Sequence, residues 1–517
     1  MRINIVGAGL AGLSAAITLA ENGVKSNLIS SMQSERAQSV MAEGGINACL
    51  NTMGESDTVE NHIEDTLRGG VNLADKNAVR GLCENAPGIV KEFYHLGVPF
   101  QTNEHGIVQR NFGGQKKKRT AFVKSSTGKM LMTALIDAVR RYEANGMIQR
   151  YPHHVLQALH IRDNKCQGIT VNDTRTGESF TFNGSVILAS GGMNGLFSGL
   201  TTGTTQNTAD AAAMCLENGV ELANLEFIQY HPTTIAIPGK RLLISEAARG
   251  EGGRLFVNKN GKPWYFMEEK YPELKNLMPR DVVSAEMVEV TSMPECENQV
   301  YLDMTEVDKR VWQSRLSDLR EQVMHYLALD PIKKPIPVSP GIHYFMGGIW
   351  VDSEHRTSAE SLYAAGECAC QYHGANRLGG NSLLGAVYGG KIAATTAMKE
   401  KASIVRTELK NAQPYSEVAP GFRNSVSQVL GRYLKILRDE NGLNHALGKL
   451  TTLESSASNP AEVRLVNLAK ATVNCALFRK ESRGAHRRTD FPKTNSDCQK
   501  QTIVQNTNVF YREMNQL

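Results

Sequence analysis

The stretch EFIQYHPTTIAIPGKRLLISEAARGEGG, from Glu226 to Gly253, concentrates side chains that could do chemistry. It holds one histidine, several hydroxyls, three lysine or arginine residues and three glutamates among small residues. Core segments seldom have this mixture, because a buried charge without a partner is costly. Glu246 and Arg249 would share one helical face, where on a surface they would form an ion pair worth little. The stretch predicts either such a surface pair or a polar reaction site.

The first residues carry the fingerprint of a dinucleotide-binding turn. An apolar strand at residues 3–6 is followed by Gly7, Gly9 and Gly12, and then by a helix that should stop near Gly23. Gly7 permits a tight turn, Gly9 lets the backbone approach a pyrophosphate, and Gly12 lets the helix pack on the strand. Because a strand precedes these glycines and a helix follows, the pattern favours a nucleotide site over a glycine-rich packing turn.

The other parts of this predicted nucleotide site are spread along the chain. The second strand, VKSNLISSM, ends in Ser30 and Ser31, where an acidic residue usually holds a ribose; a serine can still hydrogen-bond a ribose hydroxyl. Two apolar runs, SVILASGG at residues 185–192 and SLYAAGECA at residues 361–369, end in glycine turns and predict further strands. This interrupted distribution is typical of a flavin fold rather than of a contiguous NAD site.

A long proline-free segment, NSLLGAVYGGKIAATTAMKEK at residues 381–401, predicts a helix. Asn381 and Ser382 are suitable capping residues at its start. We expect the N-terminus of this helix to face the flavin, where negative charge develops on reduction. Packing of the same helix on the sheet is compatible with that role.

The composition is that of an ordinary globular protein, with 41% hydrophobic and 21% charged residues. A net charge of +5 is too small and dispersed to indicate nucleic-acid binding, and no apolar run is long enough to cross a bilayer. The nine cysteines form no CxxC pair, so we expect reduced packing thiols, no metal site and no iron–sulfur cluster in this chain. No signal peptide precedes the first strand, which predicts a cytoplasmic protein, peripheral to a membrane only through a partner.

The basic run KKKR at residues 116–119 is expected to be a solvated face, with a docking patch for an acidic electron donor as the alternative.

Several long motifs in order resemble the flavoprotein subunits of the succinate dehydrogenase and fumarate reductase family, from Ile3 to about Pro492. The resemblance implies an α/β fold: a Rossmann-like FAD-binding domain (1–225 and 335–400), interrupted by an α+β capping domain (226–334) and followed by a helical C-terminal region (401–517). The run VSQVLGRYLKILRDENG, residues 426–442, is consistent with such a helix. The motifs are SVMAEGGINA, NFGGQ, QYHPT, SEAARGEGG, PRDVV, HYFMGGI, LYAAGECA, HGANRLGGNSLLGAVYGG and ESRGAH.

The resemblance also implies how a four-carbon dicarboxylate would be held. His231 and Ser245 match the residues that bind one carboxylate in the family. His343 and Arg377 match those that bind the other. An arbitrary histidine is more often structural than ligand-binding, but here both histidines lie within family motifs. Anchoring groups of this kind can twist a carboxylate out of conjugation and make the alkene more electrophilic.

Arg280, in MPRDVV, matches the family's proton donor, and Glu246 and Arg249 match its proton-delivery relay. A guanidinium hardly ever loses its proton in proteins. Arg280 can therefore act as an acid only if the relay returns the proton quickly.

FAD is the cofactor that the resemblance implies. In covalent members a histidine bonds to the flavin, and here Gln38 holds that place. A carboxamide is not nucleophilic, so non-covalent FAD is expected, with a lower potential that favours reduction of a double bond. The implied FAD-binding residues are Gly7, Gly9, Gly12, Ser30, Ser39, Gly44, Gly45, Asp210, Glu367, Asn381, Ser382 and Leu383.

L-aspartate oxidase is the main alternative within the family, and it places a glutamate before GG to meet the substrate ammonium. Phe112 holds that place here, in QRNFGGQ, and an aromatic ring offers no ion pair. Met346 likewise stands where that enzyme tends to have cysteine. We therefore expect a fumarate reductase, acting on fumarate or a related 2-enoate.

Two further alternatives stay open: a succinate dehydrogenase subunit with an iron–sulfur partner, and a flavin-binding assembly protein that is not an enzyme. The electron donor could be such a subunit, a small redox protein or a free reduced flavin.

Overall fold

The computed structural model describes residues 2–400 and 414–514. Its first sheet has five parallel strands in the order β21-β12-β1-β2-β8, so strands from distant parts of the chain lie side by side. This confirms the predicted interrupted Rossmann-like sheet. The strands are β1 (Arg2–Val6), β2 (Lys25–Ser30), β8 (Ile148–Pro152), β12 (Val186–Leu188) and β21 (Leu362–Ala364).

Helices cover this sheet, and α1 (Leu10–Glu21) packs against α11 (Asn381–Lys399). The turn between β1 and α1 needs glycine, because a Cβ at Gly12 would lie 1.8 Å from the carbonyl oxygen of Gly7. The fingerprint glycines thus bring the start of α1 against the end of β1, as predicted. The other helices of this part are α2 (Val59–Gly69), α3 (Lys76–His95), α4 (Thr127–Ala144) and α5 (Asp210–Glu217).

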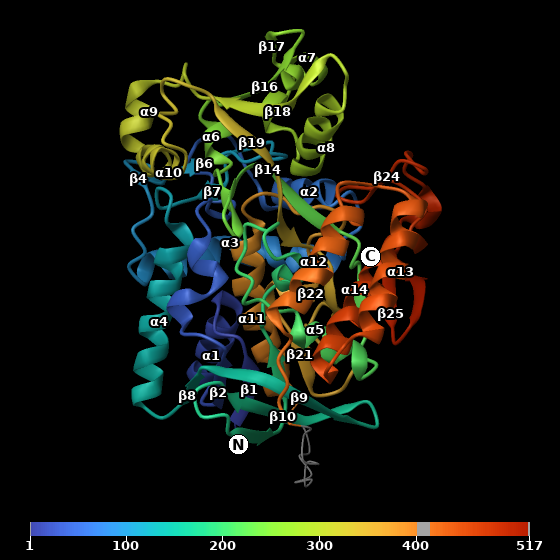
Figure 1. Cartoon of the computed structure of the whole chain (residues 1–517). Helices are drawn as coiled ribbons and strands as arrows, with labels where there is room; N and C mark the ends of the chain where they lie inside the picture. The colour runs from blue at the N-terminus through green and yellow to red at the C-terminus, as the bar shows by residue number, and fades with distance from the viewer. Residues whose placement is uncertain (1, 401–413, 515–517) are drawn as a thin grey trace.

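The capping part forms the upper end of the molecule (Figure 1). Its sheet has the strand order β15-β14-β19-β18-β16-β17 and carries five helices. The strands are β14 (Ile228–Ile237), β15 (Lys240–Leu243), β16 (Arg254–Lys259), β17 (Lys262–Trp264), β18 (Cys296–Asp303) and β19 (Ile336–Phe345). The helices are α6 (Ala247–Gly250), α7 (Phe266–Lys270), α8 (Arg280–Thr291), α9 (Lys309–Ser314) and α10 (Ser317–Leu327).

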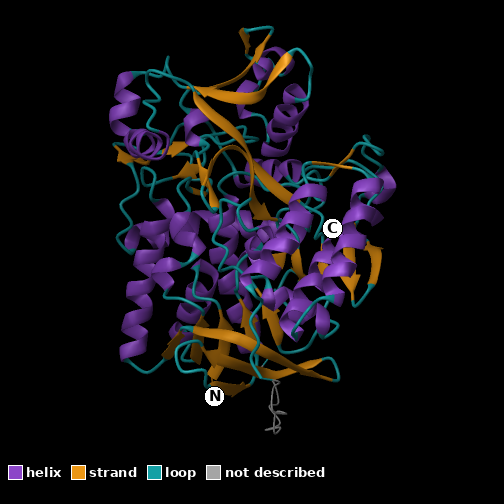
Figure 2. Ribbon diagram, viewed as in Figure 1, coloured by secondary structure: helices purple, strands orange, loops and turns teal. Residues whose placement is uncertain are grey.

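β14 and β19 run antiparallel and span both parts of the molecule, which Figure 2 shows as orange strands passing from the centre to the top. β14 carries the chain into the cap, and β19 returns it. The predicted boundary after residue 334 falls just before β19, whose first residues still pair with β18. The cap is therefore held to the rest by hydrogen-bonded strands, close to QYHPT and HYFMGGI.

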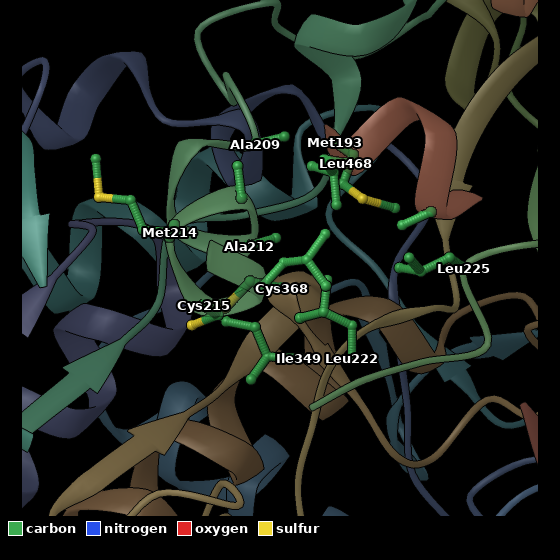
Figure 3. Close-up of a cluster of buried hydrophobic side chains, with 14 of the residues drawn as sticks. Met193, Ala209, Ala212, Met214, Cys215, Leu222, Leu225, Ile349, Cys368 and Leu468 are labelled. Carbon is green, nitrogen blue, oxygen red and sulfur yellow. The ribbon is translucent and has the colours of Figure 1, made fainter. Parts of the chain in front are cut away.

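The C-terminal region contains α12 (Pro420–Tyr433), α13 (Glu440–Ser455) and α14 (Pro460–Phe478), on one flank of the molecule (Figure 1). Leu468 of α14 belongs to the same buried cluster as Met193, Leu222 and Leu225 (Figure 3). This region therefore shares one hydrophobic core with the FAD-binding part. The beginning of the predicted region, residues 401–413, lies outside the described residues.

Three local predictions need correction. The run at residues 426–442 is not one helix: α12 ends at Tyr433, and the short strand β23 (Leu437–Arg438) pairs with β24 (Arg487–Arg488) before α13 begins. Residues 501–512 are not helical, because β25 (Gln501–Gln505) and β26 (Asn508–Arg512) form a hairpin. β25 also pairs with β13 (Leu222–Ala223).

The third correction concerns the start of α11. Gly380 caps this helix, with a φ of 83° that favours glycine, and no side chain caps it. The Asn381 side chain instead bonds to Asn47 and to Thr66, at 2.7 and 3.0 Å. The buried amide of Asn47 and the hydroxyl of Thr66 compete successfully for the Asn381 side chain, so its capping propensity is overridden.

No helix within the described residues is both long and apolar enough to cross a bilayer.

Candidate active site

A cavity of about 450 Å³ lies between the FAD-binding part and the cap. Most of the side chains predicted from the sequence line it, although they come from segments hundreds of residues apart. The predicted residues that line it are Gly7, Gly9, Ser30, Ser39, Gly44, Gly45, Phe112, Asp210, His231, Ser245, Glu246, Arg280, His343, Glu367, Arg377, Ser382 and Leu383. Those that do not line it are Gly12, Arg249 and Asn381.

Arg280 and Glu246 form a buried ion pair at the cap side of the cavity. Nε and Nη2 of Arg280 both donate to Oε2 of Glu246, at 3.0 and 2.6 Å. Arg280 is the first residue of α8 and Glu246 directly precedes α6, so two cap helices aim these groups at each other. Glu246 and Arg249 are both buried, which excludes the alternative that these two residues form a solvated surface pair.

Arg249 stands behind this pair. Its Nη2 lies 3.4 Å from Oε1 of Glu246, and its Nη1 donates to the carbonyl oxygen of Asn276 at 2.6 Å. Burial would raise the pKa of Glu246, but the charges of Arg280 and Arg249 outweigh it and lower the pKa to about 2. The three charged groups therefore lie in a row that leads away from the cavity: Arg280 is hydrogen-bonded to Glu246, and Arg249 lies within ion-pair distance of Glu246.

Gln229 is a site residue that the sequence reasoning did not single out, although it begins the QYHPT motif. Its Oε1 accepts from Nη1 of Arg280 at 3.1 Å and from Nη2 of Arg377 at 3.0 Å. Its Nε2 donates to Asn376 Oδ1 and to the Arg377 carbonyl oxygen, at 2.8 and 2.9 Å. One amide thus holds the arginine of the cap and the arginine of the FAD-binding part side by side.

Arg377 is buried next to Arg280 and also lines the cavity. Its guanidinium carbon lies 4.4 Å from the ring centroid of Tyr344, and its Nε has no hydrogen-bond partner. Burial and the nearby charge of Arg280 lower the pKa of Arg377 to about 9, so the side chain stays charged at neutral pH. Three buried arginines therefore face one carboxylate, and this excess of positive charge attracts an anion.

His231 and His343 come from the paired strands β14 and β19, and their ring centroids are 5.2 Å apart. Nδ1 of His231 lies 3.2 Å from the carbonyl oxygen and 3.3 Å from the amide nitrogen of Thr233, so the contacts fit either tautomer, whereas its Nε2 is buried without a partner. Nδ1 of His343 lies 2.9 Å from the hydroxyl of Thr202. Burial, followed by the charge of Arg280, lowers the pKa of both histidines far below its usual value. Both rings are thus neutral at pH 7.

Phe112 and Ser245 complete the set predicted to hold substrate. Phe112 is buried, and an added Cβ at Gly44 would lie 2.9 Å from its ring. The ring therefore packs directly on the GG of SVMAEGGINA. Ser245 is also buried and precedes Glu246 at the start of α6.

The residues at the other end of the cavity fit a dinucleotide cofactor. The Leu10 amide, in the first turn of α1, donates to Ser39 Oγ at 3.3 Å, and a Cβ at Gly9 would come within 3.2 Å of the same oxygen. A side chain at Gly9 would crowd Ser39, so glycine there keeps the helix N-terminus accessible to a pyrophosphate. The Ser30 hydroxyl donates to the Met32 carbonyl oxygen and keeps its lone pairs for a ribose hydroxyl.

Glu367 and Asp210 are the two acidic residues of the predicted cofactor set. Glu367 accepts from the Phe345 amide at 3.1 Å, and burial raises its pKa to about 7. Asp210 begins α5 and accepts from the hydroxyl of Thr208 at 2.7 Å.

Gln38 also lines the cavity, and its Oε1 accepts from the Thr204 amide at 2.6 Å. The carboxamide is thereby fixed by the backbone. A neutral amide with this hydrogen bond offers no nucleophile to a flavin.

One basic segment is not as predicted. Lys116 and Lys118 are partly exposed, but Arg119 is fully buried and bonded to Asp57 and Asp65, each at 2.9 Å. The expectation of a solvated face is therefore wrong for Arg119. Within the described residues, no cluster of histidine, cysteine, aspartate and glutamate could hold a metal ion.

Comparisons with known proteins agree with this architecture. Residues 3–383 match the FAD binding domain family, and residues 423–516 match the fumarate reductase flavoprotein C-terminal family. The succinate dehydrogenase flavoprotein subunit of Bacillus subtilis is 36% identical over 96% of this chain and 92% of its own length. The L-aspartate oxidase of Streptomyces coelicolor is 32% identical over 94% and 88% of the two chains.

A solved structure of a variant FrdA from the quinol fumarate reductase of E. coli superposes with a TM-score of 0.89, at 28% identity, over 99% of this chain and 96% of that chain. The predicted fold, with its interrupted FAD-binding part, cap and helical C-terminal region, is confirmed. The chain belongs to the succinate dehydrogenase and fumarate reductase flavoprotein family and is a FAD-dependent oxidoreductase of that type.

Proposed function

We propose that this protein reduces the double bond of fumarate, or of a closely related 2-enoate, to the saturated acid. The observation that carries the proposal is the excess of buried positive charge at the cap side of the cavity: Arg280 and Arg377 line the cavity, Arg249 lies behind Glu246, and within the described residues Glu246 is the carboxylate that forms ion pairs with Arg280 and Arg249. A dicarboxylate supplies the missing negative charges and accepts hydrogen bonds from the free nitrogen atoms.

Two groups of donors would hold the substrate at its two ends. His231, with its unpaired Nε2, and the Ser245 hydroxyl bind one carboxylate. His343 and Arg377 bind the other. Neutral histidines suit this role, because when Nδ1 accepts a hydrogen bond Nε2 carries a proton to donate. Phe112 covers a flat enedioate with an apolar ring.

Bound FAD, once reduced by an electron donor, would supply the hydride that one alkene carbon accepts. Arg280 gives a proton to the adjacent carbon, so that two electrons and two hydrogens are added and the product is the saturated dicarboxylate. Glu246 lies 2.6 Å from Nη2 of Arg280, close enough to return a proton as soon as one has left. Arg249 contacts the other oxygen of Glu246 and extends the path toward Asn276.

We propose further that the FAD is bound without a covalent link, because Gln38 cannot make one. A lower flavin potential then favours reduction of fumarate over oxidation of succinate. The electron donor is an iron–sulfur subunit, a small redox protein or a reduced flavin. Succinate dehydrogenase flavoprotein subunits among the relatives favour the first of these.

L-aspartate oxidation is the second candidate, because an L-aspartate oxidase is 32% identical to this chain. The side chain that weighs against it is Phe112. An ammonium there would meet an apolar ring, and the nearby carboxylate of Glu246 is already paired with two arginines.

The test begins with acid precipitation of the holoprotein, which should release all of its flavin, as FAD, into the supernatant. Under anaerobic conditions, fumarate should reoxidise the photoreduced protein quickly, whereas succinate should bleach the oxidised protein slowly or not at all. L-aspartate in air should give negligible hydrogen peroxide.

Flavin that stays with the pellet contradicts the non-covalent assignment. Succinate that bleaches the flavin as fast as fumarate restores it makes the protein a dehydrogenase. Rapid peroxide formation from L-aspartate makes it an oxidase.

A further inference from the structure

One segment of the C-terminal region, Arg483–Arg488, contacts residues close in sequence to Arg280 and to Arg377. We call it the brace. The Ala485 amide donates to the carbonyl oxygen of Ala375 at 2.9 Å, two residues before Arg377. Nη2 of Arg487 lies 3.6 Å from Oδ2 of Asp281, the residue directly after Arg280.

The contact of the brace with the FAD-binding part is tight. A Cβ at Gly484 would lie 2.5 Å from the Ala375 carbonyl oxygen, and Gly484 has a φ of 52°. The Ala375 amide in turn donates to the Gly70 carbonyl oxygen at 2.9 Å. The loop that carries Arg377 is therefore fixed on both sides by backbone contacts.

An ion pair between Arg487 and Asp281 links the brace to α8 of the cap. The side chain of Asp281 is 8% exposed and that of Arg487 is 31% exposed. Asp281 lies in the first turn of α8, where a carboxylate is favoured by the helix dipole. Oδ1 of Asp281 and Nε of Arg487 are buried without hydrogen-bond partners, so these two charges mainly balance each other.

This ion pair acts on the geometry of the site. Arg280 and Arg377 are like charges that share the one oxygen of Gln229, and they repel each other until an anion binds. Arg280 moves with α8, and an ion pair from the same helix turn to the brace resists that movement. Misplacement of a reacting group by about 1 Å can cost about 100-fold in rate.

We infer that Arg487 is a positioning residue: through Asp281 it ties α8 of the cap to the brace, which also holds the loop of Arg377, and so fixes Arg280 relative to Arg377. The inference rests on the proposed role of Arg280 as proton donor. It assigns a function to the C-terminal motif ESRGAHRR beyond packing.

The test compares the holoenzyme with Arg487→Gln, Asp281→Asn and the double variant. Each single change should lower kcat for fumarate reduction about tenfold with less than about a threefold change in KM, because alignment rather than binding is lost. The double variant should be no slower than the slower single variant, because both changes remove the same contact. Arg487→Lys keeps the positive charge, so this variant should retain at least half of the wild-type kcat.

The matched control is Arg512→Gln. Arg512 pairs with Glu221 and has nearly the same exposures, 32% and 10%, but lies away from both arginines. This variant should keep the wild-type kcat. If Arg487→Gln behaves like Arg512→Gln, or if the double-variant losses multiply, the inference is wrong.

Hydrogen exchange tests the brace without turnover. Arg487→Gln should speed exchange at the amides of the first turns of α8 in the holoenzyme, and Arg512→Gln should not. Unchanged exchange in Arg487→Gln overturns the inference. A wild-type protein that fails to reduce fumarate would instead overturn the proposed function, and the exchange result would still decide whether the brace holds the cap.

Discussion

Two groups of buried arginines differ in how their charges are balanced. Around the cavity, Arg249, Arg280 and Arg377 face one carboxylate, and nitrogen atoms of Arg249 and Arg377 lack partners. At the start of the brace, Arg483 and the nearby Arg479 face two carboxylates, Glu226 and Glu481.

The second group is nearly saturated with hydrogen bonds. Arg479 donates to Glu226, to Glu481, to Thr502 and to two carbonyl oxygens, all at 2.7 or 2.8 Å. Burial would lower the pKa of Arg479, but the charge of Glu226 outweighs it and raises the pKa. Burial alone therefore does not mark a functional arginine; the two groups differ in how many carboxylates balance the buried positive charge.

The largest expected effect is a loss of kcat when an arginine is removed from the group around the cavity. Arg280→Ala should lower kcat about 1,000-fold, because a general acid contributes about 10²- to 10⁴-fold. FAD should stay bound, and malonate should still perturb the flavin spectrum through the other donors. Steady-state kinetics and a malonate titration check both statements.

Arg241→Gln is the control for that change. Arg241 lines the same cavity, but its guanidinium bonds to Thr234 and Ser339. It should cost little activity. An equal loss in the two variants, or near-normal turnover of Arg280→Ala, would contradict the role of Arg280.

The next largest effect concerns the balanced group. Arg479→Gln should destabilise the protein by about 3–5 kcal/mol, because Glu226 and Glu481 are left buried with too little positive charge. The fraction that remains folded should keep the wild-type kcat. Thermal unfolding and active-site titration separate the two quantities.

Lys470→Ala is the control, because it removes a partly exposed ion pair with Glu454; it should change the free energy of unfolding by about 1 kcal/mol or less. A folded Arg479→Gln with a much lower kcat would show that this network also serves catalysis.

The smallest expected effect is a pH dependence of stability. Burial and then the charge of Arg438 lower the pKa of His486 well below 6.5. Below about pH 6.5 the unfolded chain binds a proton that the folded chain does not, so acidification removes about 1.4 kcal/mol per pH unit for this histidine. Glu43 and Glu367, whose pKa burial raises to about 7, act in the opposite sense between about pH 4.3 and 7.

The variant His486→Gln isolates the histidine contribution. Its melting temperature should fall less than that of wild type between pH 7 and pH 5.5. His445→Gln, at an exposed position, should follow wild type. Parallel losses in all three proteins would show that His486 does not titrate on unfolding.

Much of the fold and site could be predicted because the family motifs are local. GAGLAG predicts its own strand, turn and helix, and PRDVV and QYHPT each carry a site residue next to a recognisable pattern. That Arg280 and Arg377 lie in the same site could be predicted only from the family resemblance, because they lie in separate motifs of the chain.

The rest depends on contacts between segments. Gln229 bridges two arginines only because β14 passes between α8 and the loop of Arg377. Arg119 is the last of four basic residues in a row in the sequence, but in the structure it is buried because it forms ion pairs with the buried side chains of Asp57 and Asp65. Asn381 prefers a cap position by itself but finds Asn47 and Thr66 instead. A linear pattern contains no information on such partners.

The most direct test of the account is the rate at which two acids reoxidise the photoreduced protein in anaerobic stopped flow. Fumarate has two carboxylates for the two sets of donors, whereas crotonate replaces one of them with a methyl group. If the unbalanced arginines serve a dicarboxylate, fumarate should react at least about 100-fold faster at low concentration, since a buried charged partner left unpaired costs about 3–5 kcal/mol. Crotonate that reacts as fast as fumarate would contradict that claim.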